Sequence, residues 1–163
     1  MTLQENAVAG MAANMEMLKR TIDDFSDADL LVRPVPAANH AAWQIGHMIS
    51  SETRLVNAVS PGAMPALPAG FEARFTKDTA KLDAAAAFPS KADLLAVCQQ
   101  QRQAAIAWAK SLTQSDLDRP TPEPMRARIP NVASLMLLIP VHLAMHLGQI
   151  QVIRRTLGKP ILF

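Results

Sequence analysis

Apolar residues recur at alternating intervals of three and four near the start of the chain. This spacing places them along one face of an α-helix, as expected for a helix that packs against a core. The series consists of Val8, Met11, Met15, Leu18, Ile22 and Phe25. It predicts a helix that ends near Asp24, before the helix-breaking segment Arg33-Pro34-Val35-Pro36.

Three further helices follow from the same pattern and from capping residues. The second is predicted from Asn39, as its N-cap, to about Val59. The third opens at Ser90, with Asp93 completing a sequence that resembles a capping box. Its predicted inward-facing seam is Leu94, Val97, Gln101, Ala104, Trp108 and Leu112.

The fourth helix is predicted from about Asn131 to Leu157, because Gly158 and Pro160 follow as stop signals. Residues 60–89 contain several prolines and glycines, so they form a long connection. Within this connection we expect a short helical piece at about residues 77–87.

A faint repeat links the two halves of the chain. The segment 25–34 is echoed by 112–120, and each copy lies between a helix and a histidine-bearing helix. We therefore expect one all-α domain over residues 1–163, a four-helix bundle made of two helical hairpins. The short loops predict that the first and second helices are neighbours, and likewise the third and fourth, while the long middle connection permits a crossover.

Composition and charge narrow the function. The net charge is +2, and the sixteen Lys and Arg residues are scattered, with Arg54, Arg74 and Arg102 far apart, which argues against a nucleic-acid partner.

Residues 129–153 lack charged side chains, but two histidines and two glutamines there favour a bundle helix over a membrane span. The N-terminus lacks a secretory pattern, so a cytoplasmic location is expected. Cys98, the single cysteine, is expected to be a buried thiol.

Histidines provide the candidate chemistry. His142 and His146 are four residues apart, so both lie on one helix face, where two imidazoles can reach one ion. That face is apolar, and an unpartnered imidazole there would cost about 1–3 kcal/mol. The alternative is that each ring bonds to a backbone carbonyl or to water.

His47 lies in the middle of the second predicted helix, with Gly46 expected to let a neighbouring helix approach. A third imidazole from the other hairpin would complete a site of three neutral nitrogen ligands with an open position, which is typical of catalytic metal sites. His40 lies about 10 Å from His47 along the helix axis, so we expect it to be an N-terminal helix residue or a pocket wall.

Other polar residues flank these positions. Gln44 and Gln149 each lie three residues from a proposed ligand, and either orients an imidazole or is solvated. Glu52 is a candidate general base or an ordinary surface glutamate. Trp43 is expected in the core, and Pro140 is expected to kink the fourth helix before His142.

Two stretches of the sequence resemble the signature segments of the DinB/YfiT-like superfamily. They are residues 39–48, NHAAWQIGHM, and residues 142–150, HLAMHLGQI. The resemblance implies a four-helix bundle with up-down-down-up connections, often dimeric, in which His47, His142 and His146 bind a divalent metal. It also implies that some members are transferases or isomerases that use low-molecular-weight thiols. Pro140, two residues before His142, departs from the family motif.

These observations predict an enzyme that uses a divalent metal, Zn²⁺ or Ni²⁺, to act on a small molecule. The reaction expected is transfer involving a small thiol or metal-assisted hydrolysis. The alternatives are a non-catalytic, stress-associated metal-binding dimer and a purely structural bundle. The substrate is not indicated by the sequence.

Overall fold

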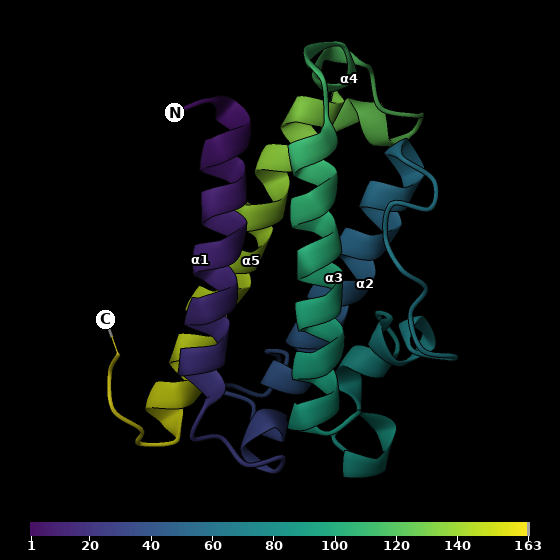
Figure 1. Ribbon diagram of the computed structural model, residues 1–163. Helices are drawn as coiled ribbons and strands as arrows, with labels where there is room; N and C mark the ends of the chain where they lie inside the picture. Colours follow the sequence, from purple (N-terminus) through teal and green to yellow (C-terminus); the bar gives the residue numbers. More distant parts are fainter. Residues whose placement is uncertain (163) are drawn as a thin grey trace.

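The computed structural model describes residues 1–162, and its main elements are four long helices, shown in Figure 1. Helix α1 spans Leu3–Ile22, α2 spans Ala41–Val59, α3 spans Lys91–Ser111 and α5 spans Val132–Thr156. A short helix, α4, covers Gln114–Asp118 between α3 and α5. Five 3₁₀ turns complete the described helical elements: η1 (Asp29–Leu31), η2 (Glu72–Phe75), η3 (Thr79–Lys81), η4 (Ala85–Ala87) and η5 (Met125–Ala127).

The helices follow the up-down-down-up order, as predicted. In Figure 1, α1 and α5 run in one direction, whereas α2 and α3 run in the other. Helix α1 packs against α3 and α5, and α2 packs against the same two helices. Helices α1 and α2 therefore lie on one diagonal of the bundle and α3 and α5 on the other, so the prediction that these pairs are neighbours was wrong. This arrangement places α2 directly beside α5, so the two histidine-bearing helices face each other.

Helix ends follow local capping chemistry. The Thr2 side chain accepts from the Glu5 N–H and Glu5 caps the Thr2 N–H in return, which fixes the start of α1. Asn131 caps α5 as predicted, with its Oδ1 accepting from the Ser134 N–H. Helix α2 differs from the prediction, because its N-cap is His40 and not Asn39.

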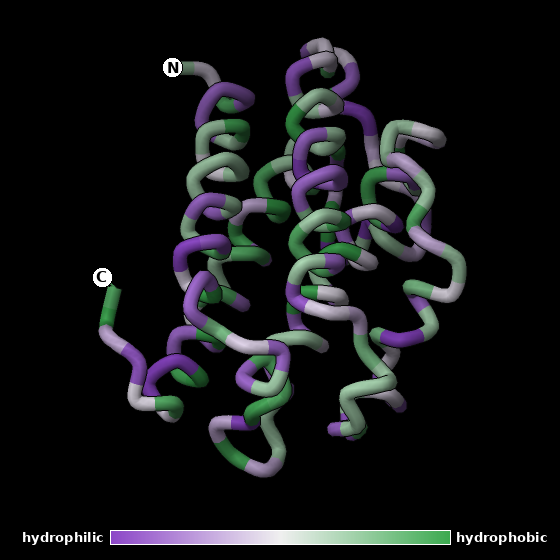
Figure 2. The backbone as a smooth tube through the Cα atoms, turned by 60° about the horizontal axis from the view of Figure 1, so that its bottom comes forward, coloured by the Kyte–Doolittle hydropathy of each residue, from purple (hydrophilic) through white to green (hydrophobic). Residues whose placement is uncertain are grey.

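The core is formed by the inward faces of α1, α3 and α5 and by most of α2, which the connection after it also covers. Figure 2 shows hydrophilic and hydrophobic residues alternating along α1 and α3, as amphipathic helices require. In α3 the predicted seam was partly wrong: Val97 and Ala104 are half-buried, while Cys98, Arg102 and Ala105 face inward. Arg102 is buried although it is charged, so apolar spacing alone does not place it on the inward face.

By length and composition alone, helix α5 is long and apolar enough to span a membrane. Of its most apolar 18-residue segment, 39% is buried inside the protein. It packs against α1 and α2 in the bundle. The helix runs through Pro140 without a break, and the Pro140 carbonyl accepts from Asn14 Nδ2 at 2.7 Å. Gly10 lies against the same proline, since a Cβ at Gly10 would stand 3.2 Å from Pro140 Cβ. Helices α1 and α5 are therefore in close contact at Pro140, two residues before His142.

The connection 60–90 contains 3₁₀ turns where a short helix was expected at residues 77–87. It is fixed to α2 by specific contacts. Trp43 Nε1 donates to the Thr76 carbonyl at 3.1 Å. The Phe75 ring lies directly on the backbone of Gly46, where an added Cβ would be only 2.1 Å from Phe75 Cε1. Gly46 therefore admits an aromatic ring from the connection, and not a neighbouring helix as predicted.

Candidate metal centre

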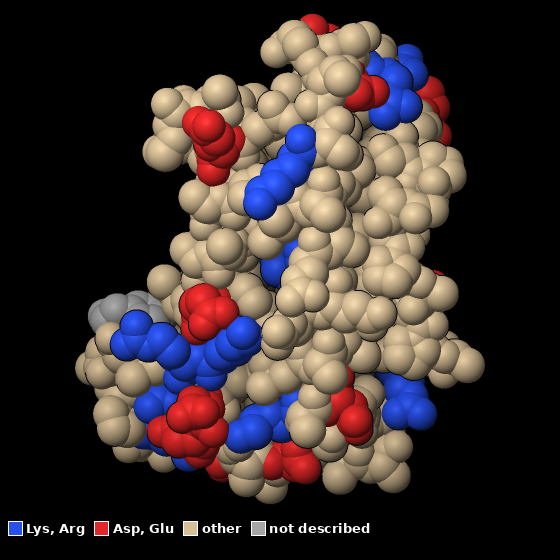
Figure 3. Space-filling view, in the orientation of Figure 1, with Lys and Arg blue, Asp and Glu red and all other residues tan. Residues whose placement is uncertain are grey.

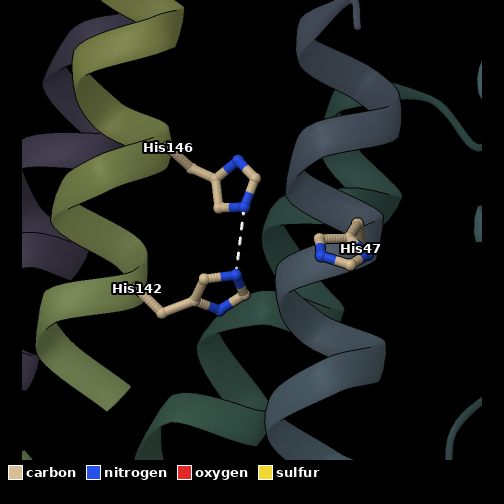
Figure 4. A group of neighbouring side chains, drawn as sticks. All are labelled: His47, His142 and His146. Atoms are coloured by element: carbon tan, nitrogen blue, oxygen red, sulfur yellow. Dashed lines mark hydrogen bonds between the residues drawn. The ribbon is translucent and has the colours of Figure 1, made fainter. Parts of the chain in front are cut away.

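Three imidazoles meet between α2 and α5. Figure 4 shows His142 and His146 extending from α5 toward α2, which carries His47. One ring nitrogen from each residue lies within 4.8 Å of the other two. The centroid of the His47 ring is 5.6 Å from that of His142 and 5.5 Å from that of His146. The three residues predicted from sequence are thus brought together.

Hydrogen bonds fix the orientation of His146. Gln44 Nε2 donates to the Asn39 carbonyl at 2.7 Å, which directs Gln44 Oε1 toward His146 Nδ1 at 3.1 Å. The Nδ1 atom of His146 must therefore carry the proton, so a neutral ring has its lone pair on Nε2. Gln44 is almost fully buried, as an orienting residue requires.

The nitrogen pair on α5 has a separation suited to a shared ligand. His146 Nε2 lies 3.1 Å from His142 Nε2 (Figure 4). Two nitrogens bound tetrahedrally to zinc at about 2.0–2.1 Å lie roughly 3.3 Å apart, close to this value. The His47 nitrogen needs a shift of about 1.5 Å to reach the same separation, which side-chain rotation can supply. The donor set therefore fits a divalent cation.

Burial favours the neutral form of all three rings. Desolvation lowers the pKa of His146 to about 4, with the charges of His142 and His47 adding to the effect. Burial also lowers the pKa values of His47 and His142. The charge of Arg54 lowers the pKa of His47 further. Neutral imidazoles are the form that binds metal ions, so the rings are ready as ligands near neutral pH.

His40 lies outside this group. Its Nδ1 accepts from the Trp43 N–H at 3.1 Å, and its Nε2 lies 3.1 Å from the Leu82 carbonyl. The ring is fully buried and edge-on to Phe88, with centroids 4.6 Å apart. His40 is an N-terminal capping residue, one of the two roles expected for it.

Glu52 has neither of the roles considered for it. It is buried, and its Oε2 lies 2.8 Å from Nη2 of Arg102 on α3. Burial raises the pKa of the Glu52 carboxyl, and the Arg102 guanidinium opposes that rise. Gln149, which also flanks a ligand, is exposed. Cys98 on α3 is buried as predicted, and burial raises the pKa of its thiol to about 12.

The centre adjoins a cavity of about 440 Å³ that the sequence did not predict. His47 lines it, and Trp43 stacks on the His47 ring at a centroid distance of 4.8 Å and an angle of 7°. The core prediction for Trp43 was right, but its second role at this wall was missed. The opposite wall comes from the connection between α2 and α3, whose irregular sequence gives no periodic signal.

Comparison with known proteins agrees with this geometry. Residues 11–150 match the sequence model of the DinB superfamily. The chain belongs to the DinB superfamily. Among curated proteins, none matches.

Two solved structures share the DinB fold of this chain. A conserved protein from Enterococcus faecalis has a TM-score of 0.73 at 14% identity, covering 98% of this chain and 99% of that one. YfiT from Bacillus subtilis has a TM-score of 0.69 at 16% identity, covering 96% of this chain and 89% of that one. YfiT is described as "a probable metal-dependent hydrolase with an unusual four-helix bundle topology". At these identities the likeness establishes the fold.

Proposed function

We propose that this DinB-superfamily protein is a metal-dependent hydrolase that acts on a small molecule. His47, His142 and His146 would hold the cation, with Zn²⁺ as the first choice and Ni²⁺ as the second, because imidazole suits both ions. Bound there, a divalent cation supplies Lewis acidity and activates water as a nucleophile near neutral pH.

One observation carries the proposal. The Nε2 atoms of His142 and His146 lie 3.1 Å apart, and the buried Gln44 fixes the proton of His146 on its other ring nitrogen. His40 is instead satisfied by backbone groups, with its Nδ1 accepting from the Trp43 N–H and its Nε2 beside the Leu82 carbonyl. The description of YfiT as a hydrolase gives further support to this reaction class.

Residues around the centre would orient the substrate and limit access of water. Trp43 covers one face of His47, and Phe75 closes the cavity wall against α2. Three protein ligands leave positions open for a substrate, whereas structural zinc sites usually have four. On the face in Figure 3 acidic and basic side chains are interspersed over a mostly uncharged surface, which favours a small-molecule substrate over a nucleic acid.

A metal assay joined to a variant tests the function. Protein purified without added metal should contain about one Zn²⁺ or Ni²⁺ per chain, and His146→Ala should lose it while keeping its helical circular dichroism. Ester, amide and phosphoester probes, each with and without a low-molecular-weight thiol, then separate hydrolysis from thiol transfer. Metal bound without turnover of any probe would favour the non-catalytic dimer.

We also propose that the protein is a homodimer in which α5 contributes to the interface. Large apolar side chains are exposed along one stripe of α5, at Leu137, Val141, Met145 and Val152. The stripe is about 22 Å long, and a two-fold axis would pair it with its own copy. Light scattering should give twice the chain mass, and the monomer mass for Met145→Glu; a wild-type monomer would refute the dimer.

A further inference from the structure

The cavity beside His47 has charged and polar walls that the proposed function leaves unassigned. Its α2 wall carries Trp43, His47, Ser50, Ser51 and Arg54, which lie on one face of the helix. Residues of η2 and the following turn form the other wall, including Glu72, Phe75 and Lys77. The cavity thus joins the candidate metal centre through His47 and extends along α2 toward Arg54.

Arg54 is available to bind a ligand. Its side chain is exposed, and among residues 1–162 it forms no ion pair. Lys77, on the facing wall, is likewise exposed and unpaired within this part of the chain, while Glu72 is the one carboxylate among the lining residues. Two cations and one anion give these walls a net positive charge, which favours an anionic ligand.

Ser50 supplies an independent observation. Its side chain is more than nine-tenths buried and lines the cavity, yet its Oγ has no hydrogen-bond partner. Leaving a buried hydroxyl unpaired is unfavourable, and most such groups in folded proteins find a partner. Ser50 precedes Arg54 by one helical turn, so a hydroxyl and a guanidinium lie on the same side of α2.

We propose that this cavity binds the carboxylate or phosphate group of the substrate, with Arg54 and Ser50 as hydrogen-bond donors. Arginine offers paired N–H groups to either anion, and a serine hydroxyl rotates to donate to a further oxygen. Trp43 and Phe75 would contact an apolar part of the same molecule. The assignment of this ligand as the substrate rests on the function proposed for His47.

Calorimetric titration of the full chain with simple probes tests the assignment. Benzoate and phenyl phosphate serve as anions and benzamide as the neutral analogue, with protein treated with a chelator so that no probe can bind a metal. We expect both anions to bind at least about tenfold more tightly than benzamide. The anion with the higher affinity identifies the group, carboxylate or phosphate.

Variants then locate the binding. Arg54→Ala should weaken anion binding by about tenfold or more, Arg54→Lys should weaken it less, and Ser50→Ala should weaken it by roughly threefold. Arg74→Ala is the matched control, because Arg74 lies on η2 but does not line this cavity. This variant should bind the anions with the same affinity as the wild type. Circular dichroism verifies that each variant is folded.

Equal affinity of wild type and Arg54→Ala, equal affinity for benzoate and benzamide, or no anion binding by about 10 mM would each overturn the assignment. Metal analysis of the same preparations separates it from the proposed function. Anion binding that depends on Arg54 in a protein that never binds metal would refute only the hydrolase. If the protein binds metal and Arg54→Ala does not change anion binding, only the cavity assignment is refuted.

Discussion

The buried ion pair between Glu52 and Arg102 allows a sharp test of the bundle interior. The pair joins α2 to α3 at 2.8 Å, while Glu52 Oε1 and Arg102 Nε and Nη1 are buried without partners. Replacing Glu52 by Gln keeps the side-chain shape and removes the negative charge. Arg102 is then left as a buried cation without a counterion, which costs about 3–5 kcal/mol.

The size of this loss can be converted into a measurement. The free energy of unfolding of a small domain is about 5–15 kcal/mol, so Glu52→Gln removes a large fraction of the stability. With a urea dependence near 2 kcal/mol per M, a loss of about 4 kcal/mol lowers the unfolding midpoint by roughly 2 M. Urea titrations followed by circular dichroism measure this shift directly.

The double variant Glu52→Leu/Arg102→Met is the matched control. It removes both charges, so its unfolding free energy should lie close to that of the wild type or above it. A Glu52→Gln midpoint within about 0.5 M of the wild type, or a double variant as unstable as Glu52→Gln, would refute the reasoning. If Glu52→Gln lost metal or activity without losing stability, Glu52 would instead have a role at the metal centre.

Three further predictions concern the site itself. Gln44→Leu removes the acceptor that orients His146 and should weaken metal affinity by about 10–100-fold, measured by chelator competition; unchanged affinity would contradict the orienting role. Gly46→Ala forces a Cβ to 2.1 Å from Phe75 and should destabilise the protein by about 1–3 kcal/mol in thermal unfolding. In a Phe75→Ala background the same change should stabilise by up to about 1 kcal/mol, and destabilisation there would show that Phe75 is not the obstacle. The pKa of His146 is lowered from 6.5 to about 4, so the unfolded chain binds more protons in this range and metal-free protein should lose stability as the pH falls from about 6.5 to about 4. A His146→Gln variant should lose less over the same window, and an identical profile would contradict the assignment.

Much of the fold was readable from the sequence because periodicity and capping residues act locally. The spacing from Val8 to Phe25 identified α1, and Asn131 with Gly158 bounded α5. The bundle order came from the family resemblance, whereas loop length alone wrongly made α1 a neighbour of α2 and α3 a neighbour of α5. Short connections limit distance, and they do not decide whether two helices are adjacent or diagonal.

The candidate ligands could also be predicted from local sequence pattern, but the residues around them could not. The spacing of His142 and His146 is a property of one helix, and Gln44 was recognised as a candidate partner. The ion pair of Glu52 depends on contact between distant helices. The wall at Phe75 belongs to a connection without periodic pattern, so no local signal could place it on Gly46.

Metal content of the purified protein tests the central claim most directly. Elemental analysis of wild type, His47→Ala, His142→Ala and His146→Ala should find about one Zn²⁺ or Ni²⁺ per wild-type chain. Each variant should retain its helical spectrum and lose most of the metal. His40→Ala is the control, since His40 bonds to the Leu82 carbonyl away from the centre, and it should keep the metal if folded. Wild-type protein that takes up neither ion after dialysis against both, or triad variants that retain it, would contradict the account.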